Sequence, residues 1–199
     1  MRTLILSALA ALSLAACAPG MDSRPVTTAM APAPAPEYKV GDVFTFKVAV
    51  VEDDQRVTAV DGNVATFDSK IFGTLKQPKA FSNPASWTGS GYALPQTVTL
   101  TSDMSALFPL QIGKSVRSTG TGTFAGTQRA VAAQCDVVAS VNVMVPAGRF
   151  DTYMVECGFV LDANIATVRY VYWYAPSVGH WVAVNRNGSI HQLLSYKRA

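Results

Sequence analysis

The stretch VAAQCDVVASVNVMV at residues 131–145, the turn Pro146-Ala147-Gly148 and the stretch FDTYMVECGFVL at residues 150–161 decide the fold. Both flanks are rich in β-branched and aromatic residues, which favour extended backbone. Proline and glycine between them are typical of a tight turn. The sequence here therefore predicts a long antiparallel hairpin.

This hairpin contains two of the three cysteines, Cys135 and Cys157. In an oxidising compartment such a pair predicts a disulfide, which for a loop of this size contributes about 3 kcal/mol. Two buried free thiols or a functional thiol are the alternatives, although no CxxC motif occurs. If Val145 paired with Arg149, the cysteines would lie diagonally, roughly 7–8 Å apart at Cα, which is too far to bridge. We therefore predict an irregularity between Gln134 and Val145.

The rest of the chain from Tyr38 onward alternates short extended runs with turn residues. Asp61-Gly62-Asn63 and Asn187-Gly188 are strong hairpin turn signals. Glu52-Asp53-Asp54 is interpreted as a further, solvated turn. Strands are expected at 43–51, 57–60, 64–67, 97–101, 116–124, 167–174, 181–185 and 189–196.

Two segments depart from this pattern. Residues 71–96 contain three prolines and several glycines and serines, so a long loop is expected there. Residues 103–108 are compatible with a helical turn that has Ser102 as its N-cap. Because no α-helix is visible after the N-terminal segment, the fold class is expected to be mainly β. The architecture would be an antiparallel curved sheet, open half-barrel or sandwich with short helical turns.

The N-terminus contains Arg2, an apolar run over residues 4–14, and then Ala15-Ala16-Cys17. The run is too short for a membrane span, which needs about 20 apolar residues. It resembles the lipobox of bacterial lipoproteins, which implies cleavage before Cys17 and acylation of that residue. The alternative is a short buried helix that ends at a cysteine. Ala18, in place of an aspartate, implies the outer membrane, with the protein facing the periplasm.

Residues 18–37 are rich in proline and alanine. Proline removes backbone donors and favours extended chain, so we expect a tether that reaches roughly 60 Å at about 3.1 Å per residue. A ligand for a proline-binding partner is the alternative. The expected organisation is a signal peptide at 1–17, a tether at 18–37 and one β-domain at 38–199.

The formal net charge of +3 is too small for a nucleic-acid-binding footprint. It is compatible with weak attraction to anionic lipid. The expected partners are therefore the membrane, through the N-terminal anchor, and a lipid or an envelope protein.

Two stretches carry a family resemblance: Val145-Pro146-Ala147-Gly148-Arg149-Phe150-Asp151-Thr152, and residues 172–182, which read YWYAPSVGHWV. Residues 108–114, FPLQIGK, fit the same pattern. Together they resemble a group of bacterial periplasmic and lipoprotein β-domains of unknown function. The group is distantly similar in architecture to the lipoprotein-carrier (LolA/LolB-like) half-barrel. The resemblance implies a half-barrel over residues 38–199.

Catalytic and metal-binding motifs are absent from the sequence, so we expect no enzyme activity, no cofactor and no metal site. His180 could act as a base, but a turn histidine that caps a strand is the simpler interpretation. His191 is interpreted as a partly exposed strand residue. The acidic run at residues 52–54 could bind a cation, against the simpler interpretation of a solvated hairpin tip.

The aromatic strand near the C-terminus is the best candidate for a ligand or partner surface. Tyrosine and tryptophan suit such surfaces because they combine large apolar area with a polar group. The alternative is that both faces of the strand are core. The candidate residues are Tyr170, Tyr172, Tyr174, Trp181 and, from the 71–96 segment, Trp87.

Three functions follow from these observations. The first is a lipid-anchored envelope protein whose β-domain binds an apolar ligand, a lipid or an envelope protein. The second is a structural envelope scaffold without a ligand. The third, an envelope hydrolase, depends only on His180 and nearby carboxylates or serines.

Overall fold

The structure is a computed structural model that describes residues 21–79, 86–87, 96–124, 126–162 and 166–199. Its described part contains thirteen strands and one 3-10 turn, η1 (Met104–Leu107). The strands are β1 (Ser23–Pro25), β2 (Val43–Val48), β3 (Val51–Asp61), β4 (Val64–Ser69), β5 (Gly73–Pro78), β6 (Ser86–Trp87), β7 (Gln96–Leu100), β8 (Ser115–Phe124), β9 (Thr127–Val145), β10 (Gly148–Leu161), β11 (Ala166–Ala175), β12 (His180–Arg186) and β13 (Ser189–Lys197).

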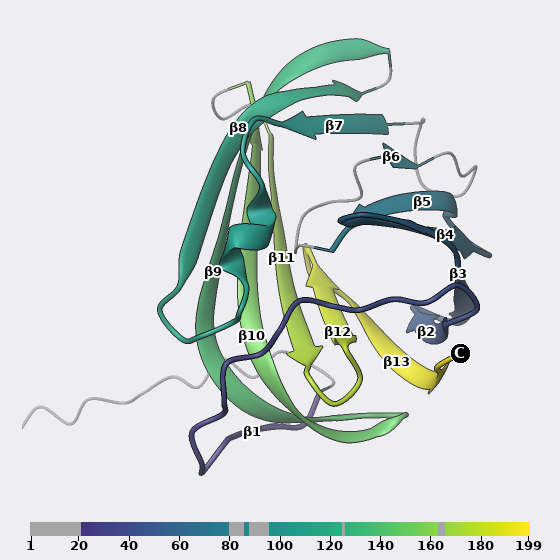
Figure 1. Ribbon diagram of the computed structural model, residues 1–199, viewed down its shortest axis with the longest axis vertical. Helices are drawn as coiled ribbons and strands as arrows, with labels where there is room; N and C mark the ends of the chain where they lie inside the picture. Colours follow the sequence, from purple (N-terminus) through teal and green to yellow (C-terminus); the bar gives the residue numbers. More distant parts are fainter. Residues whose placement is uncertain (1–20, 80–85, 88–95, 125, 163–165) are drawn as a thin grey trace, which may run out of the picture.

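All the strands belong to one antiparallel sheet, ordered β1-β9-β10-β11-β12-β13-β2-β3-β4-β5-β6-β7-β8. β8 also pairs with β9, so the sheet curls around a common interior. The tall strands β8 to β11 form one wall, and β2 to β5, β12 and β13 lie opposite its lower part (Figure 1). The expectation of a mainly β, antiparallel curved sheet with a short helical turn is confirmed.

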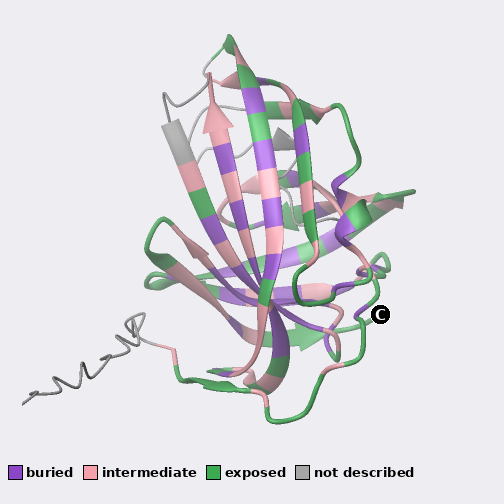
Figure 2. Ribbon diagram, turned by 90° about the vertical axis from the view of Figure 1, so that its left-hand side faces the viewer, coloured by how far each residue is buried: buried purple, intermediate pink, exposed green. Residues whose placement is uncertain are grey.

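Alternation along the strands builds the core. On β2, Phe44, Phe46 and Val48 are buried while the residues between them are not. On β9, every second residue from Val131 to Val137 is buried. The same alternation is visible along the tall strands in Figure 2. Because a strand turns successive side chains to opposite faces, one face fills the interior and the other meets solvent.

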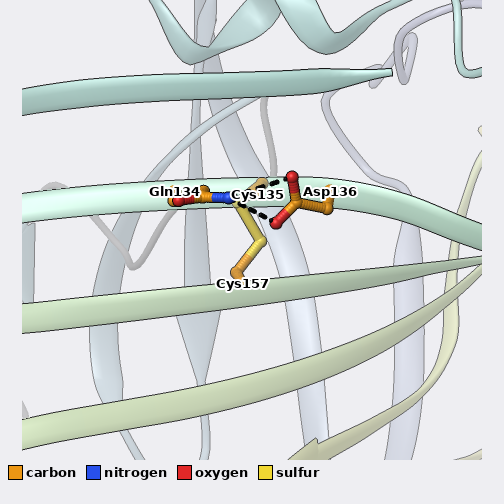
Figure 3. The surroundings of a disulfide bond; sticks show 4 residues. All are labelled: Gln134, Cys135, Asp136 and Cys157. Carbon is orange, nitrogen blue, oxygen red and sulfur yellow. Dashed lines mark hydrogen bonds between the residues drawn. A yellow bond between two sulfur atoms is a disulfide. The ribbon is translucent and has the colours of Figure 1, made fainter. Parts of the chain in front are cut away.

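The β9–β10 hairpin contains the expected disulfide and the expected irregularity. Cys135 and Cys157 are bonded, with their Cα atoms 4.1 Å apart (Figure 3). The register shifts where Met154 pairs with Ala139 but Val155 pairs with Val137. This shift places the two cysteines directly opposite each other.

The expected pairing of Val145 with Arg149 is wrong by one residue. Val145 pairs with Gly148, so the turn contains only Pro146 and Ala147. Gly148 has φ 132°, a conformation that favours glycine, and this permits the tighter turn.

The acidic run at residues 52–54 is part of β3 and not a turn. The turn lies one step earlier, at Ala49-Val50, where Ala49 has φ 55°. Asp53 is fully buried, because its place on β3 turns it toward the interior. The interpretation of a solvated hairpin tip is therefore wrong for this residue.

The expected long loop at 71–96 contains strands where the structure describes it, namely β5, β6 and the start of β7. Pro78 ends β5 and does not prevent the strand. The expected helical turn is present as η1, but its N-cap is Asp103 and not Ser102. The Asp103 carboxylate accepts a hydrogen bond from the Ser105 amide at 2.8 Å.

The proline-rich segment does not form a free tether over its described residues. β1 pairs with β9, and Ala33 forms a β-bridge with Leu110 and is buried. The Tyr153 hydroxyl donates to the carbonyls of Met30 and Ala31. Prolines leave backbone carbonyls without intrasegment donors, and tyrosine hydroxyls of the domain supply them. The segment therefore lies along the domain from residue 21 onward (Figure 1).

The described residues include no helix long and apolar enough to cross a membrane. The expected signal peptide at 1–17 lies outside the described residues.

Candidate functional site

The aromatic strand, the candidate for a ligand or partner surface, is part of the core. Tyr170, Tyr172 and Tyr174 are 7%, 5% and 1% exposed, and Trp181 is 7% exposed. Of the two alternatives, an open tyrosine face and a core strand, the structure shows the core strand. The backbone of Trp87 pairs with Leu75, while its side chain lies outside the described residues.

Two features enclose these rings. A register shift between Trp173 and Tyr174 interrupts the alternation of β11, so residues 172–175 are all buried. The N-terminal segment then covers Tyr174, whose hydroxyl donates to the Pro34 carbonyl at 3.1 Å. Burial raises the pKa of Tyr172 and Tyr174.

His180 begins β12 and lies fully inside the core. Its ring stacks on Phe44 at 4.2 Å, and its Nδ1 is 2.6 Å from the Tyr38 hydroxyl. Desolvation, helped by the Arg198 guanidinium, lowers the pKa of His180 to about 3. The ring is therefore neutral at physiological pH. Among the described residues, no hydrogen-bond partner lies within reach of its Nε2 atom.

The position of His180 bears on two earlier interpretations. His180 follows the turn at residues 176–179 and begins β12, as the interpretation of a turn histidine that caps a strand expected, but its side chain is fully buried in the core. A fully enclosed imidazole offers a substrate no access in this structure, so His180 itself gives the hydrolase hypothesis no support.

Besides His180, the interior contains a second cluster of buried polar side chains, which is centred on Asp53. Its carboxylate accepts hydrogen bonds from Ser69 Oγ at 2.7 Å, Gln55 Nε2 at 2.8 Å and the Ile71 amide at 3.0 Å. A buried carboxylate is tolerated when donors replace water in this way. The half-buried His191 lies nearby. Burial, and to a lesser extent Arg186, lowers the pKa of His191, whereas the negative charge of Asp53 raises it. Sequence reasoning missed this group.

A groove of about 600 Å³ lies on the outer side of the wall formed by β8 to β11. Most of its lining residues lie at alternate positions on β8, β9 and β10, on the face opposite the core, and the buried residues Ser118, Ala133 and Cys157 also border it. The residues Thr101 and Ser102, which follow β7, contribute one edge. The lining residues are Thr101, Ser102, Arg117, Ser118, Thr119, Ala132, Ala133, Gln134, Asp136, Glu156, Cys157, Gly158, Val160 and Arg169.

The groove has a small, partly apolar floor and charged flanks. A Cβ atom added at Gly158 would meet nothing within 4 Å, so the space above this glycine is open. Arg169 lies 3.4 Å from Glu156. Gln134 donates to both oxygens of Asp136, at 3.1 and 2.8 Å, beside the disulfide (Figure 3). With Arg117, the groove holds two positive and two negative side chains.

Exposed apolar residues lie next to this groove. Val138, two residues beyond Asp136, is 39% exposed. Ile112 is 60% exposed, and the adjacent Gly113 amide donates to the Val137 carbonyl, which brings the 111–114 turn beside β9. The groove with these two residues is called the wall groove below. Sequence analysis singled out Ser102 as an N-cap and Cys157 as a disulfide partner, but it selected no residue of the groove as part of a surface, because the lining comes from four different strands and the residues after β7.

The part of the chain that the structure describes contains no group of three or more His, Cys, Asp or Glu side chains placed to hold a metal ion.

Comparison with known proteins supports the fold. No family model matches the chain, and no curated protein matches it. The structure is similar to the hypothetical lipoprotein YmcC from Escherichia coli, with a TM-score of 0.54 and 8% identity, covering 79% of this chain and 84% of that one.

Two further solved structures are similar to a lesser degree. One, from Bacteroides fragilis, is described as an exported protein with a YmcC-like fold (TM-score 0.48, 13% identity, 83% of this chain and 100% of that one). The other, from Parabacteroides distasonis, is described as a lipoprotein (TM-score 0.45, 13% identity, 84% and 100%). The expected kinship with the lipoprotein-carrier half-barrel is not among these findings. The chain therefore shares its fold with YmcC.

Proposed function

We propose that this chain is a lipid-anchored envelope protein that binds another envelope protein through the wall groove. The wall groove itself is the observation that carries the proposal. It has a volume of about 600 Å³ and is lined by charges of both signs, and exposed apolar residues lie beside it.

The chemistry of the groove favours a protein partner. Charges of both signs, fixed on rigid strands, discriminate between partners by complementarity. Val138 and Ile112 supply apolar contact area beside these charges, as the cores of protein interfaces do. A balanced set of two arginines and two carboxylates does not suit a strongly anionic polymer.

The anchor is supported by the sequence Leu14-Ala15-Ala16-Cys17 and by the fold shared with a hypothetical lipoprotein. Acylation would contribute about 0.8 kcal/mol for each buried CH₂ group, so several chains would hold the domain stably at the membrane. The proposed location is the outer membrane, with the domain facing the periplasm.

An apolar ligand or lipid in the sheet interior is a weaker proposal. The candidate tyrosines are buried by protein atoms, and the small hollow beside Tyr174 and Trp181 has a volume of only about 10 Å³. That is about enough for one water molecule.

Site-specific photo-crosslinking in living cells tests the proposed partner. A photoreactive p-benzoylphenylalanine would replace Ala132 on the groove floor and, as a control, the exposed Thr58 on β3. We expect a discrete protein adduct from position 132 and none from position 58. The charge reversals Arg117→Glu and Arg169→Glu should abolish this adduct without changing the melting temperature.

The same adducts from both positions would contradict the proposal, as would an adduct that survives the charge reversals. Adducts at other outer positions with none at 119, 132 or 160 would favour the structural scaffold.

A further inference from the structure

We infer that the domain rests directly on the bilayer, with the end that carries the β9–β10 turn against the lipid headgroups. This orientation rests on the proposed acylation of Cys17. This end of the domain would contact the same membrane into which the acyl chains of Cys17 insert.

Chain direction supplies the first step. β1 is antiparallel to β9, with Ser23 beside Val143 and Pro25 beside Val141. Going backward from Pro25 therefore moves toward the β9–β10 turn. The ladder continues one step further, because the Met144 amide donates to the Asp22 carbonyl at 2.9 Å. The chain leaves the domain toward the anchor at the level of this turn, at the lower end of Figure 1.

The length of chain before this point is short. Only residues 18–20 separate Cys17 from Met21. Fully extended, four residue steps span at most about 14 Å. Met21 packs against the core, and the Asp22 carboxylate pairs with Arg149 at 2.8 Å and with Arg24 at 3.4 Å. The proline-rich segment, which was expected to be a tether, therefore packs on the domain from Met21 onward.

The surface at this end suits an interface between water and lipid. Met144 is 41% exposed and Tyr196 is 40% exposed, the latter beside Phe150. Tyrosine is favoured at headgroup level, since it combines an apolar ring with a polar hydroxyl. Arg24 is largely exposed and can reach lipid phosphates.

The orientation has a consequence for the wall groove. Gly158 lies ten residues beyond Gly148 along β10, which corresponds to at most about 33 Å at 3.3 Å per residue. The groove would then lie farther from the headgroups than the β9–β10 turn does.

Photo-crosslinking from lipid tests this orientation. The acylated full chain would be placed in vesicles of phosphatidylethanolamine and phosphatidylglycerol that contain a lipid with a photoreactive headgroup. Adducts would be mapped by mass spectrometry. We expect the peptides that contain Met144 and Tyr196 to be labelled several-fold more than those from β8.

A matched variant carries a flexible Gly-Ser insertion of about 20 residues between Gly20 and Met21. It keeps the anchor and the domain but should lose the preferential labelling. Evenly spread adducts in the wild type, or unchanged labelling in the insertion variant, would overturn the inference alone. An unacylated Cys17 would overturn both the proposed anchor and the inference.

Discussion

The buried His180 should make the stability of the domain depend on pH in a defined window. Its pKa is lowered to about 3, whereas an unfolded histidine titrates near 6.5. As the pH falls below the unfolded value, the unfolded chain binds a proton that the native ring does not. Stability is therefore fully present above about pH 7 and is lost progressively as the pH falls from 6.5 toward 3.

The size of the effect follows from linkage. One pKa unit corresponds to about 1.4 kcal/mol. One histidine that stays neutral in the native state but is protonated in the unfolded chain therefore lowers the free energy of unfolding by about 2 kcal/mol between about pH 7 and pH 5. This window lies above the range in which carboxyl groups titrate, and the pKa values of Asp22, Asp103 and Asp162 are lowered further. Histidines therefore dominate the change between these two pH values.

The perturbation is the double variant Tyr38→Phe/His180→Phe, which removes both partners of the buried hydrogen bond. Phenylalanine at 180 keeps a flat ring against Phe44. Some stability will be lost at every pH because the core must repack. The informative quantity is therefore the difference in unfolding free energy between the two pH values, measured by urea unfolding.

We expect the wild type to lose at least about 2 kcal/mol between pH 7 and pH 5 and the double variant to lose about 2 kcal/mol less. The control His191→Gln, at the other and only half-buried histidine, should retain the His180 contribution. Equal losses in the wild type and the double variant would refute the conclusion that His180 is neutral and enclosed.

Two further predictions concern stability. The variant Cys135→Ala/Cys157→Ala, which opens a loop with a sequence separation of 22, should lower the unfolding free energy by about 3 kcal/mol. A reductant should destabilise the wild type similarly and leave the variant unchanged, and an equal response of both would contradict this. Gly120→Ala should cost about 1–3 kcal/mol, because its Cβ would lie 2.0 Å from the Thr99 carbonyl oxygen. The matched change Gly158→Ala meets open space and should stay within about 0.5 kcal/mol of wild type, so equal losses would show that the β7–β8 contact is described wrongly.

The β9–β10 hairpin could be predicted from sequence because its signals are local. Turn chemistry located residues 146–148, and period-2 alternation located both flanks. An uninterrupted register would have placed the two cysteines too far apart for a disulfide, so the sequence predicted an irregularity, and the structure contains it as a register shift. The one-residue error at the turn arose because Gly148 closes a two-residue loop.

The interior polar groups could not be predicted in the same way. An acidic run resembles a solvated turn unless the donors that will face it are known. For Asp53, those donors lie on Ser69, Gln55 and the backbone of Ile71, from other parts of the sheet as well as its own strand. A hint was present, since Asp53, Gln55 and Val57 share one face of a strand whose last member is apolar.

The N-terminal segment failed as a prediction for a related reason. Proline-rich sequence indicates extended chain but does not say what the chain lies against. The tyrosine hydroxyls that bind its carbonyls, on Tyr153 and Tyr174, come from residues more than a hundred positions away. The wall groove was missed because its charged residues, Arg117, Asp136, Glu156 and Arg169, come together only after four strands pair.

The most direct test of the central claim, that this is a lipid-anchored envelope protein, is the intact mass of the chain purified from the membranes of its own cells. The account predicts a chain that begins at Cys17, carries acyl chains on that residue and is two hydrogens lighter than the reduced form. A chain that keeps residues 1–16, or one that begins at Cys17 without acyl mass, would contradict the claim.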